Sequence, residues 1–119
     1  MLTQEIGQLA EQRALDYLIN HGLKCVMRNY SCRVGEIDLI MRDGAYLVFI
    51  EVRARSSMNF GGGIASITYA KRQKIIKTTA HYMIKHKVYD SFPIRFDVLS
   101  IDGKSRVITW TKDAFGADY

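Results

Sequence analysis

The N-terminal part of the chain has the periodicity of an amphipathic helix. Apolar side chains recur at intervals of three and four between residues 3 and 20, at Ile6, Leu9, Ala10, Ala14, Tyr17 and Leu18. This spacing predicts a helix with one face against a core. Gly22 follows directly, and a glycine in this place is typical of a helix C-cap.

The pattern then changes to one that is typical of strands. Residues 24–31, 34–42 and 45–54 are rich in aliphatic and aromatic side chains and predict three consecutive strands. The dipeptide Asp43-Gly44 separates the second from the third and is a strong hairpin signal. We therefore expect an antiparallel pair at this point.

A second helix and a second hairpin follow. Residues 56–66, "SSMNFGGGIAS", predict a glycine-rich loop, and residues 68–87 predict a helix. Its expected core face carries Tyr69, Ile76, Ala80 and Met83, and another face carries Lys71, Lys74, His81 and Lys85. Residues 93–101 and 105–111 predict two strands joined across Asp102-Gly103, and residues 112–119 a loose tail.

The element order is thus helix, three strands, helix and two strands. This order predicts an α/β fold in which a mixed sheet is flanked by helices, with residues 1–119 forming one domain. No apolar run approaches the roughly 18 residues of a membrane helix, and the N-terminus does not read as a signal peptide, so we expect a cytoplasmic protein. Cys25 and Cys32 lack the spacing of metal ligands and are expected to be reduced and buried.

The charge distribution indicates a polyanionic partner. The formal net charge is +5, and no Asp or Glu occurs from Val52 through Tyr89. Eight basic residues fall in that window, namely Arg53, Arg55, Lys71, Arg72, Lys74, Lys77, Lys85 and Lys87. Nucleic acid is the natural partner for such a segment. An acidic protein is the alternative, and the salt dependence of binding would separate the two.

Three acids stand out in the expected hairpin. A turn centred on Asp43-Gly44 pairs residues whose numbers sum to 87, which places Glu36 opposite Glu51 and Asp38 opposite Phe49. Because side chains alternate along a strand, these acids and Arg53 share one face. The other face is expected to be core and carries Ile37, Leu39, Met41, Val48, Ile50 and Val52.

We expect a cation to lie beside acids that are clustered in this way. Like charges across a strand pair repel, and a divalent ion such as Mg²⁺ or Mn²⁺ would relieve the repulsion. Asp38 and Glu51, with the backbone carbonyl of Val52, are the expected ligands, and Arg53 is placed to hold a phosphate. The alternative is a solvated sheet face on which Glu36, Glu51 and Arg53 form ordinary ion pairs.

The motifs carry a family resemblance. The pattern Asp38, twelve residues, Glu51, one residue, Arg53 resembles the PD-(D/E)XK nuclease superfamily. More closely, "GEIDLI", "VFIEVRAR", "NFGGGIASI" and the Lys71 helix resemble the YraN-like family of bacterial predicted endonucleases, which are related to archaeal Holliday junction resolvases. The resemblance runs from about Gly7 to Asp97. It implies a restriction-endonuclease-like core.

The resemblance also implies roles for single residues. Asp38 and Glu51 correspond to the metal-binding acids, Arg53 to the motif lysine and Glu11 to an additional acid. These four would form the catalytic set of a Mg²⁺- or Mn²⁺-dependent nuclease that hydrolyses phosphodiester bonds in DNA, branched or structured DNA included. A guanidinium does not act as a base, so Arg53 would instead stabilise charge on the phosphate.

The remaining site residues are expected to bind nucleic acid. Arg53, Arg55, Lys71, Gln73 and Lys74 are the candidates for phosphate contacts. A solvated charged face is the alternative for each single lysine. An inactive nucleic-acid-binding adaptor of the same fold is the alternative function, and a homodimer is compatible with the resemblance.

Overall fold

The computed structural model describes residues 3–55, 67–88 and 91–116, with side chains described from Gly7 onward. The element order is α1 (Thr3–Asn20), β1 (Lys24–Ser31), β2 (Glu36–Asp43), β3 (Tyr46–Arg55), α3 (Tyr69–Lys85), β4 (Ile94–Asp102) and β5 (Ile108–Phe115). This is the predicted order of helix, three strands, helix and two strands. The glycine-rich residues 56–66, predicted as a loop, lie outside the described part.

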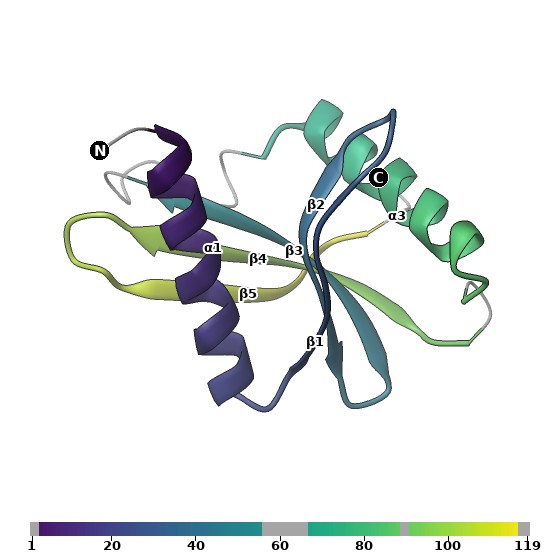
Figure 1. Ribbon diagram of the computed structural model, residues 1–119, viewed down its shortest axis with the longest axis horizontal. Coiled ribbons are helices and arrows are strands. Elements are labelled where there is room, and N and C mark those ends of the chain that lie inside the picture. The colour runs from purple at the N-terminus through teal and green to yellow at the C-terminus, as the bar shows by residue number, and fades with distance from the viewer. Residues whose placement is uncertain (1–2, 56–66, 89–90, 117–119) are drawn as a thin grey trace.

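The strands form one mixed sheet with a helix on each side. The strand order is β1-β2-β3-β4-β5, with β3 and β4 parallel and the other neighbours antiparallel. The parallel pair arises because α3 lies between β3 and β4 in the chain and carries it back to the same end of the sheet. Figure 1 shows α1 and α3 on opposite sides of the sheet. The prediction of a mixed α/β fold is confirmed.

Both faces of the sheet are therefore buried. On the α1 side, Ala10, Ala14, Leu15 and Leu18 pack against Leu39, Met41, Val48, Ile50, Leu99 and Ile101. On the α3 side, Ile75, Tyr82 and Met83 pack against Ile37, Ile40, Phe49, Phe96 and Val98. Coverage on both sides explains why β3 and β4 are almost continuously apolar. Ile37 lies in the α3-side cluster, so its predicted grouping with Leu39 is wrong.

Both helices have defined ends. After α1, the Leu23 N–H donates to the Leu18 carbonyl at 3.1 Å, and Gly22 has a φ of +92°, as predicted for a C-cap. The Thr68 side chain caps α3 by accepting from the Lys71 N–H at 3.1 Å. These caps place the first turn of α3, and with it Lys71, at a fixed point beside the sheet.

The predicted core face of α3 was partly wrong. Tyr69 and Ala80 are exposed, whereas the buried residues are Ile75, Thr78, Thr79, Tyr82 and Met83. Two of the buried residues are threonines, so the spacing of apolar residues alone did not indicate this face. Thr78 is tolerated there because its hydroxyl donates to the Lys74 carbonyl at 2.7 Å.

The register of the β2–β3 hairpin also differs from the prediction. Paired residues run from Leu39↔Ile50 to Asp43↔Tyr46, so their numbers sum to 89 rather than 87. The reason is the turn: Gly44, with a φ of +60°, takes its first central position and Ala45 its second. A shift by two leaves the alternation of side chains between Leu39 and Asp43 unchanged. It brings Asp38 instead of Glu36 to the position beside Glu51.

The second strand of the C-terminal hairpin, β5, begins and ends later in the chain than predicted. The Asp102 carboxylate accepts from the backbone N–H groups of Lys104 and Ser105, at 2.8 and 3.3 Å, and folds the following residues into a turn. Strand β5 consequently starts at Ile108 and includes residues 112–115, which had been assigned to a loose tail.

Two smaller predictions concern thiols and membrane spans. Both cysteines are free, but Cys25 is exposed and Cys32 only half-buried, so the prediction of buried thiols was wrong. In the described part of the chain, neither helix is long and apolar enough to cross a bilayer.

Candidate functional site

Asp38 and Glu51 meet where β2 and β3 run beyond their last paired residues, Leu39 and Ile50. The Asp38 carboxylate accepts a hydrogen bond from the Val52 N–H at 2.8 Å. Glu51 is 6% exposed, and one oxygen of its carboxyl group, Oε2, is buried without a hydrogen-bond partner in the described part of the chain. The predicted alternative of a solvated face is therefore wrong at Glu51.

Lys71 supplies a positive charge beside Glu51. Its ammonium nitrogen lies 3.3 Å from Glu51 Oε2, which makes an ion pair without hydrogen-bond geometry. Lys71 belongs to the first turn of α3 and lies one turn before the buried Ile75, so its side chain starts on the sheet-facing side of the helix. The same residue had been placed on a separate basic face, and the structure brings it into the carboxylate site instead.

The protonation of Glu51 reflects these surroundings. The pKa of the Glu51 carboxyl is raised to about 8: burial is the largest cause, a hydrogen bond with Asp38 and the charge of Asp38 add to it, and Lys71 acts in the opposite direction. The ionised form is therefore unfavourable unless more positive charge arrives. A carboxyl group in this condition is typical of functional sites, although structural networks also produce it.

Glu11 reaches the same site from α1. Burial raises the pKa of its carboxyl group, and the neighbouring charge of Asp38 adds to this, as does that of Glu36 more weakly. A hydrogen bond with Asn29 and the charge of Arg28 oppose the rise. Glu11 thus interacts electrostatically with Asp38, as expected for an additional acid, while Glu36 is exposed at the rim.

The two arginines of β3 follow the carboxylates toward the end of the strand. Arg53 is half-buried and pairs with Ser100 of β4, and Val52 between it and Glu51 donates its N–H to Asp38. Arg55 pairs with Asp102, and its carbonyl accepts the Gly103 N–H. Arg53 thus lies two residues beyond Glu51, so its side chain starts on the same face of the strand, and Arg55 is the last residue of the strand.

A surface hollow adjoins the carboxylates. It has a volume of about 360 Å³ and is lined on one side by Cys32, Gly35 and Glu36 and on the other by Lys71 and Lys74. Gly35 permits this close approach, since a Cβ atom there would lie 3.1 Å from the Thr78 hydroxyl of α3. The hollow brings the predicted phosphate contacts Lys71 and Lys74 together. Gln73 is half-buried on the same helical turn.

Comparison with known proteins places the chain in a family. Residues 10–101 match the profile described as "Uncharacterised protein family UPF0102". A UPF0102 protein of Legionella pneumophila (strain Corby) is 71% identical over 116 residues, which cover 98% of each chain. The chain belongs to the UPF0102 family. This is the YraN-like family that the sequence motifs resemble.

More distant relatives match over nearly the full chain as well. A UPF0102 protein of Methylobacillus flagellatus is 48% identical and covers 96% of this chain and 99% of its own. One from Coxiella burnetii (strain RSA 331 / Henzerling II) is 44% identical, with 99% and 98% covered. The family thus extends over the helices, the sheet and the carboxylate site together.

The donor set of this UPF0102 chain suits a hard divalent cation. Asp38 and Glu51 offer carboxylate oxygens, and the buried, unpartnered Oε2 of Glu51 is an acceptor that a cation would satisfy. No group of three or more Asp, Glu, His or Cys side chains converges on one point within the described residues. Such an ion would therefore have two side-chain ligands, as is common for Mg²⁺, which keeps several waters.

Sequence reasoning missed the contact between Lys71 and Glu51. The absence of acids between residues 52 and 89 drew attention to Lys71 as a basic residue. It did not indicate which way the Lys71 side chain points. The pattern Ile75, Thr78, Thr79 and Tyr82, read with threonine as a core residue, has helical spacing and would have placed Lys71 above the sheet.

Proposed function

We propose that this protein is a metal-dependent nuclease of the PD-(D/E)XK type that hydrolyses phosphodiester bonds in DNA, branched or structured DNA included. The observation that carries the proposal is the Asp38–Glu51 pair, in which a buried oxygen of Glu51 has no hydrogen bond within the described residues. Burying a carboxylate beside a second acid is costly, and a divalent cation would remove that cost. The ion pair with the half-exposed Lys71 offsets only part of it.

Each residue of the site has a role in this proposal. Asp38 and Glu51 would hold Mg²⁺ or Mn²⁺, together with the backbone at Val52. Such an ion supplies a Lewis acid that lowers the pKa of water and neutralises charge on a phosphate. Arg53 would stabilise negative charge that develops on the phosphate, since a guanidinium stays protonated. Glu11 would assist as the additional acid beside Asp38.

Lys71 would have two positions in this scheme. In the structure it neutralises part of the Glu51 charge. With a divalent ion at the carboxylates, the Lys71 ammonium group would be free to bind a phosphate in the adjoining hollow, which Lys71 and Lys74 both line. There Lys71, Lys74 and Gln73 would bind the phosphate backbone, with Arg55 adding a contact at the end of β3.

The fold supports the same proposal. A mixed sheet with helices on both faces is compatible with a restriction-endonuclease-like core, and the acids stand where β2 and β3 diverge beyond their pairing. The relation to archaeal resolvases rests on the motifs. Action on DNA would also place the protein in the cytoplasm.

A second candidate is nucleic-acid binding without cleavage. It is favoured by the ion pair of Lys71 with Glu51, because that pair occupies the carboxylate which a metal would need. Such an adaptor would retain the basic surface and lose the ion.

One experiment separates the two candidates. Labelled linear duplex, single-stranded and four-way-junction DNA is incubated with the protein in Mg²⁺ or Mn²⁺, beside the Asp38→Asn/Glu51→Gln protein purified in the same way. Asp16→Asn is the matched control, because Asp16 is exposed on α1 and is not part of the site. Cleavage by wild type and control alone is the expected result.

The contrary results are equally clear. DNA binding without cleavage, together with no effect of Mg²⁺ on thermal stability, would favour the adaptor. Equal cleavage by all three proteins would indicate a contaminating nuclease and overturn the catalytic assignment.

A further inference from the structure

A second pocket lies on the α1 side of the sheet, away from the carboxylates. Its volume is about 360 Å³, which falls within the range of ligand pockets, roughly 300 to 1,000 Å³. Helix α1 contributes Leu9, Ala10 and Arg13, the sheet contributes Ala54 and Ile101, and the β4–β5 turn contributes Arg106. None of the roles proposed above uses this pocket.

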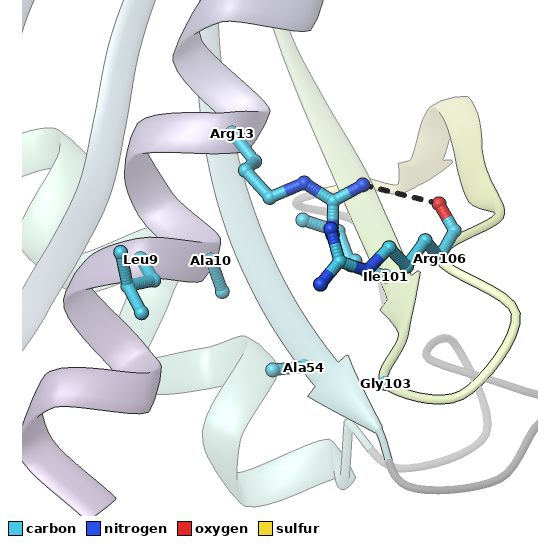
Figure 2. Close-up of a pocket in the computed structure, with 7 residues that line it drawn as sticks. All are labelled: Leu9, Ala10, Arg13, Ala54, Ile101, Gly103 and Arg106. Carbon is cyan, nitrogen blue, oxygen red and sulfur yellow. Dashed lines mark hydrogen bonds between the residues drawn. The ribbon is translucent and has the colours of Figure 1, made fainter. Parts of the chain in front are cut away.

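Two guanidinium groups converge in it. Arg13 extends from α1 and Arg106 from the opposite wall, and both point into the pocket (Figure 2). Neither forms an ion pair with an acid whose side chain the structure describes. Two like charges in one small space repel each other, so this arrangement is most favourable when an anion lies between them.

The position of Arg106 is fixed by its backbone. Its φ is +62°, which is uncommon for a residue other than glycine. Its N–H donates to the Asp102 carbonyl at 2.9 Å, and its carbonyl accepts from Arg13 Nη2 at 3.2 Å. This bond uses one donor of Arg13, and a guanidinium group carries several more. The backbone of this wall of the pocket is therefore held in place before a ligand binds, which favours binding.

We propose that this pocket binds a phosphate group between Arg13 and Arg106. A planar guanidinium matches the oxygens of a phosphate and can donate two parallel hydrogen bonds. The apolar floor of Leu9, Ala10 and Ile101 would receive the organic part attached to the phosphate, such as a sugar or a base. Leu9 is 52% exposed, so it remains available for such a contact.

The source of the phosphate is inferred from the position of the pocket. Ala54 on its wall is three residues beyond Glu51 on β3, roughly 10 Å along the strand. We assign the pocket to a backbone phosphate of the nucleic acid that is bound at the carboxylate site. This assignment rests on the proposed function. A free nucleotide offers the same chemistry and is the other source to be tested.

The test compares two variants of the β4–β5 turn. Arg106→Gln removes a charge from the pocket, whereas Lys104→Gln removes a charge from the same turn outside the pocket. Binding of single-stranded and duplex oligonucleotides, thymidine monophosphate and inorganic phosphate is measured in EDTA, where metal-dependent cleavage does not occur. In parallel, the amide resonances of Ala54 and Arg106 are followed by NMR during each titration.

We expect Arg106→Gln to weaken oligonucleotide binding about tenfold, as loss of a charge-assisted hydrogen bond does, and Lys104→Gln to weaken it less than about twofold. The amides of Ala54 and Arg106 should shift in wild type. If only thymidine monophosphate or inorganic phosphate responds to Arg106→Gln, the phosphate site stands and its assignment to nucleic acid is wrong. Equal effects of both variants, or no shift at Ala54, would overturn the site, whether or not the protein cleaves DNA.

Discussion

Two buried carboxylates on neighbouring strands, Glu51 of β3 and Asp97 of β4, have opposite surroundings. Asp97 is fully buried and accepts four hydrogen bonds, two from Arg95 and one each from the Trp110 indole and the Asp113 N–H, all at 2.9 Å. Glu51 is almost as buried, yet one of its oxygens has no hydrogen-bond partner among the described residues.

The difference shows that Asp97 is the acid that stabilises the fold. A buried charge that is paired and hydrogen-bonded on all sides stabilises one conformation, and Arg95 extends this network to Asp43 at 2.9 Å. The Asp97 and Asp43 carboxylates raise the pKa of Arg95, so its guanidinium group remains charged. Glu51 instead lies 3.3 Å from the Lys71 ammonium and beside a second acid, Asp38. Under the proposed function, its oxygen without a hydrogen bond is where a cation would bind.

The largest effect should come from Asp97. Asp97→Asn leaves Arg95 with a buried, poorly compensated charge, and we expect a loss of about 3–5 kcal/mol in the free energy of unfolding. Urea denaturation measures it. The exposed Asp16→Asn is the matched control and should stay within about 0.5 kcal/mol of wild type. A change of less than about 1 kcal/mol at Asp97 would contradict its structural role.

Metal ions should act on Glu51 and not on Asp97. At one hundred times its dissociation constant, Mg²⁺ should stabilise the wild type by about 2.7 kcal/mol, seen as a rise in Tm. The rise should be larger at pH 8.5 than at pH 6, because Glu51 must lose its proton to bind the ion. Asp38→Asn should abolish it and Asp16→Asn should preserve it. A rise that persists in Asp38→Asn would place the ion elsewhere.

Glu51→Gln should change how stability depends on pH. The Glu51 pKa is about 8 in the folded protein and near its ordinary value of 4.5 when unfolded, so the wild type takes up a proton on folding between these values. Its stability is full below about pH 4.5 and falls as the pH rises to about 8. Gln does not titrate, so Glu51→Gln should exceed wild type at pH 8.5 by about 4 kcal/mol more than at pH 5.

Urea denaturation at pH 5, 7 and 8.5 provides the measurement for Glu51→Gln. An equal loss of stability at all three values would show that Glu51, like Asp97, is needed by the fold in its ionised form.

The smallest effect concerns Lys71. Its charge lowers the Glu51 pKa, so Lys71→Gln should raise that pKa above its wild-type value. The side chain of Lys71 is 40% exposed, and we expect a stability change below about 1 kcal/mol. An NMR titration of the Glu51 carboxyl carbon measures the pKa, with the exposed Lys77→Gln as control. An unchanged pKa would mean that the ion pair is absent in solution.

Several parts of the fold were predictable because they depend on local patterns. The helix at residues 3–20 and its cap at Gly22 follow from apolar spacing and from the one residue that adopts a positive φ easily. The alternation along β2 and β3 put Asp38 and Glu51 on one face in either register. The order of elements then led to a mixed sheet.

Other parts were not predictable from local patterns. The hairpin register depended on whether Gly44 took the first or the second position of the turn, and both are compatible with the sequence. The core face of α3 contains Thr78 and Thr79, and because threonine is a polar residue the apolar periodicity of this face was incomplete. Asp97 attracted no attention because its partner Trp110 comes from a strand thirteen residues away.

The sequence by itself determined the elements, their order and the set of acids and bases available for chemistry, because backbone preferences and side-chain alternation act over a few residues. Only the tertiary structure decided which charges meet. It placed Glu51 beside Lys71, gave Asp97 two hydrogen bonds from Arg95, and brought Arg13 and Arg106 from distant segments into one pocket. Burial and the pairing of charges depend on distances across the sheet, which spacing along a chain does not fix.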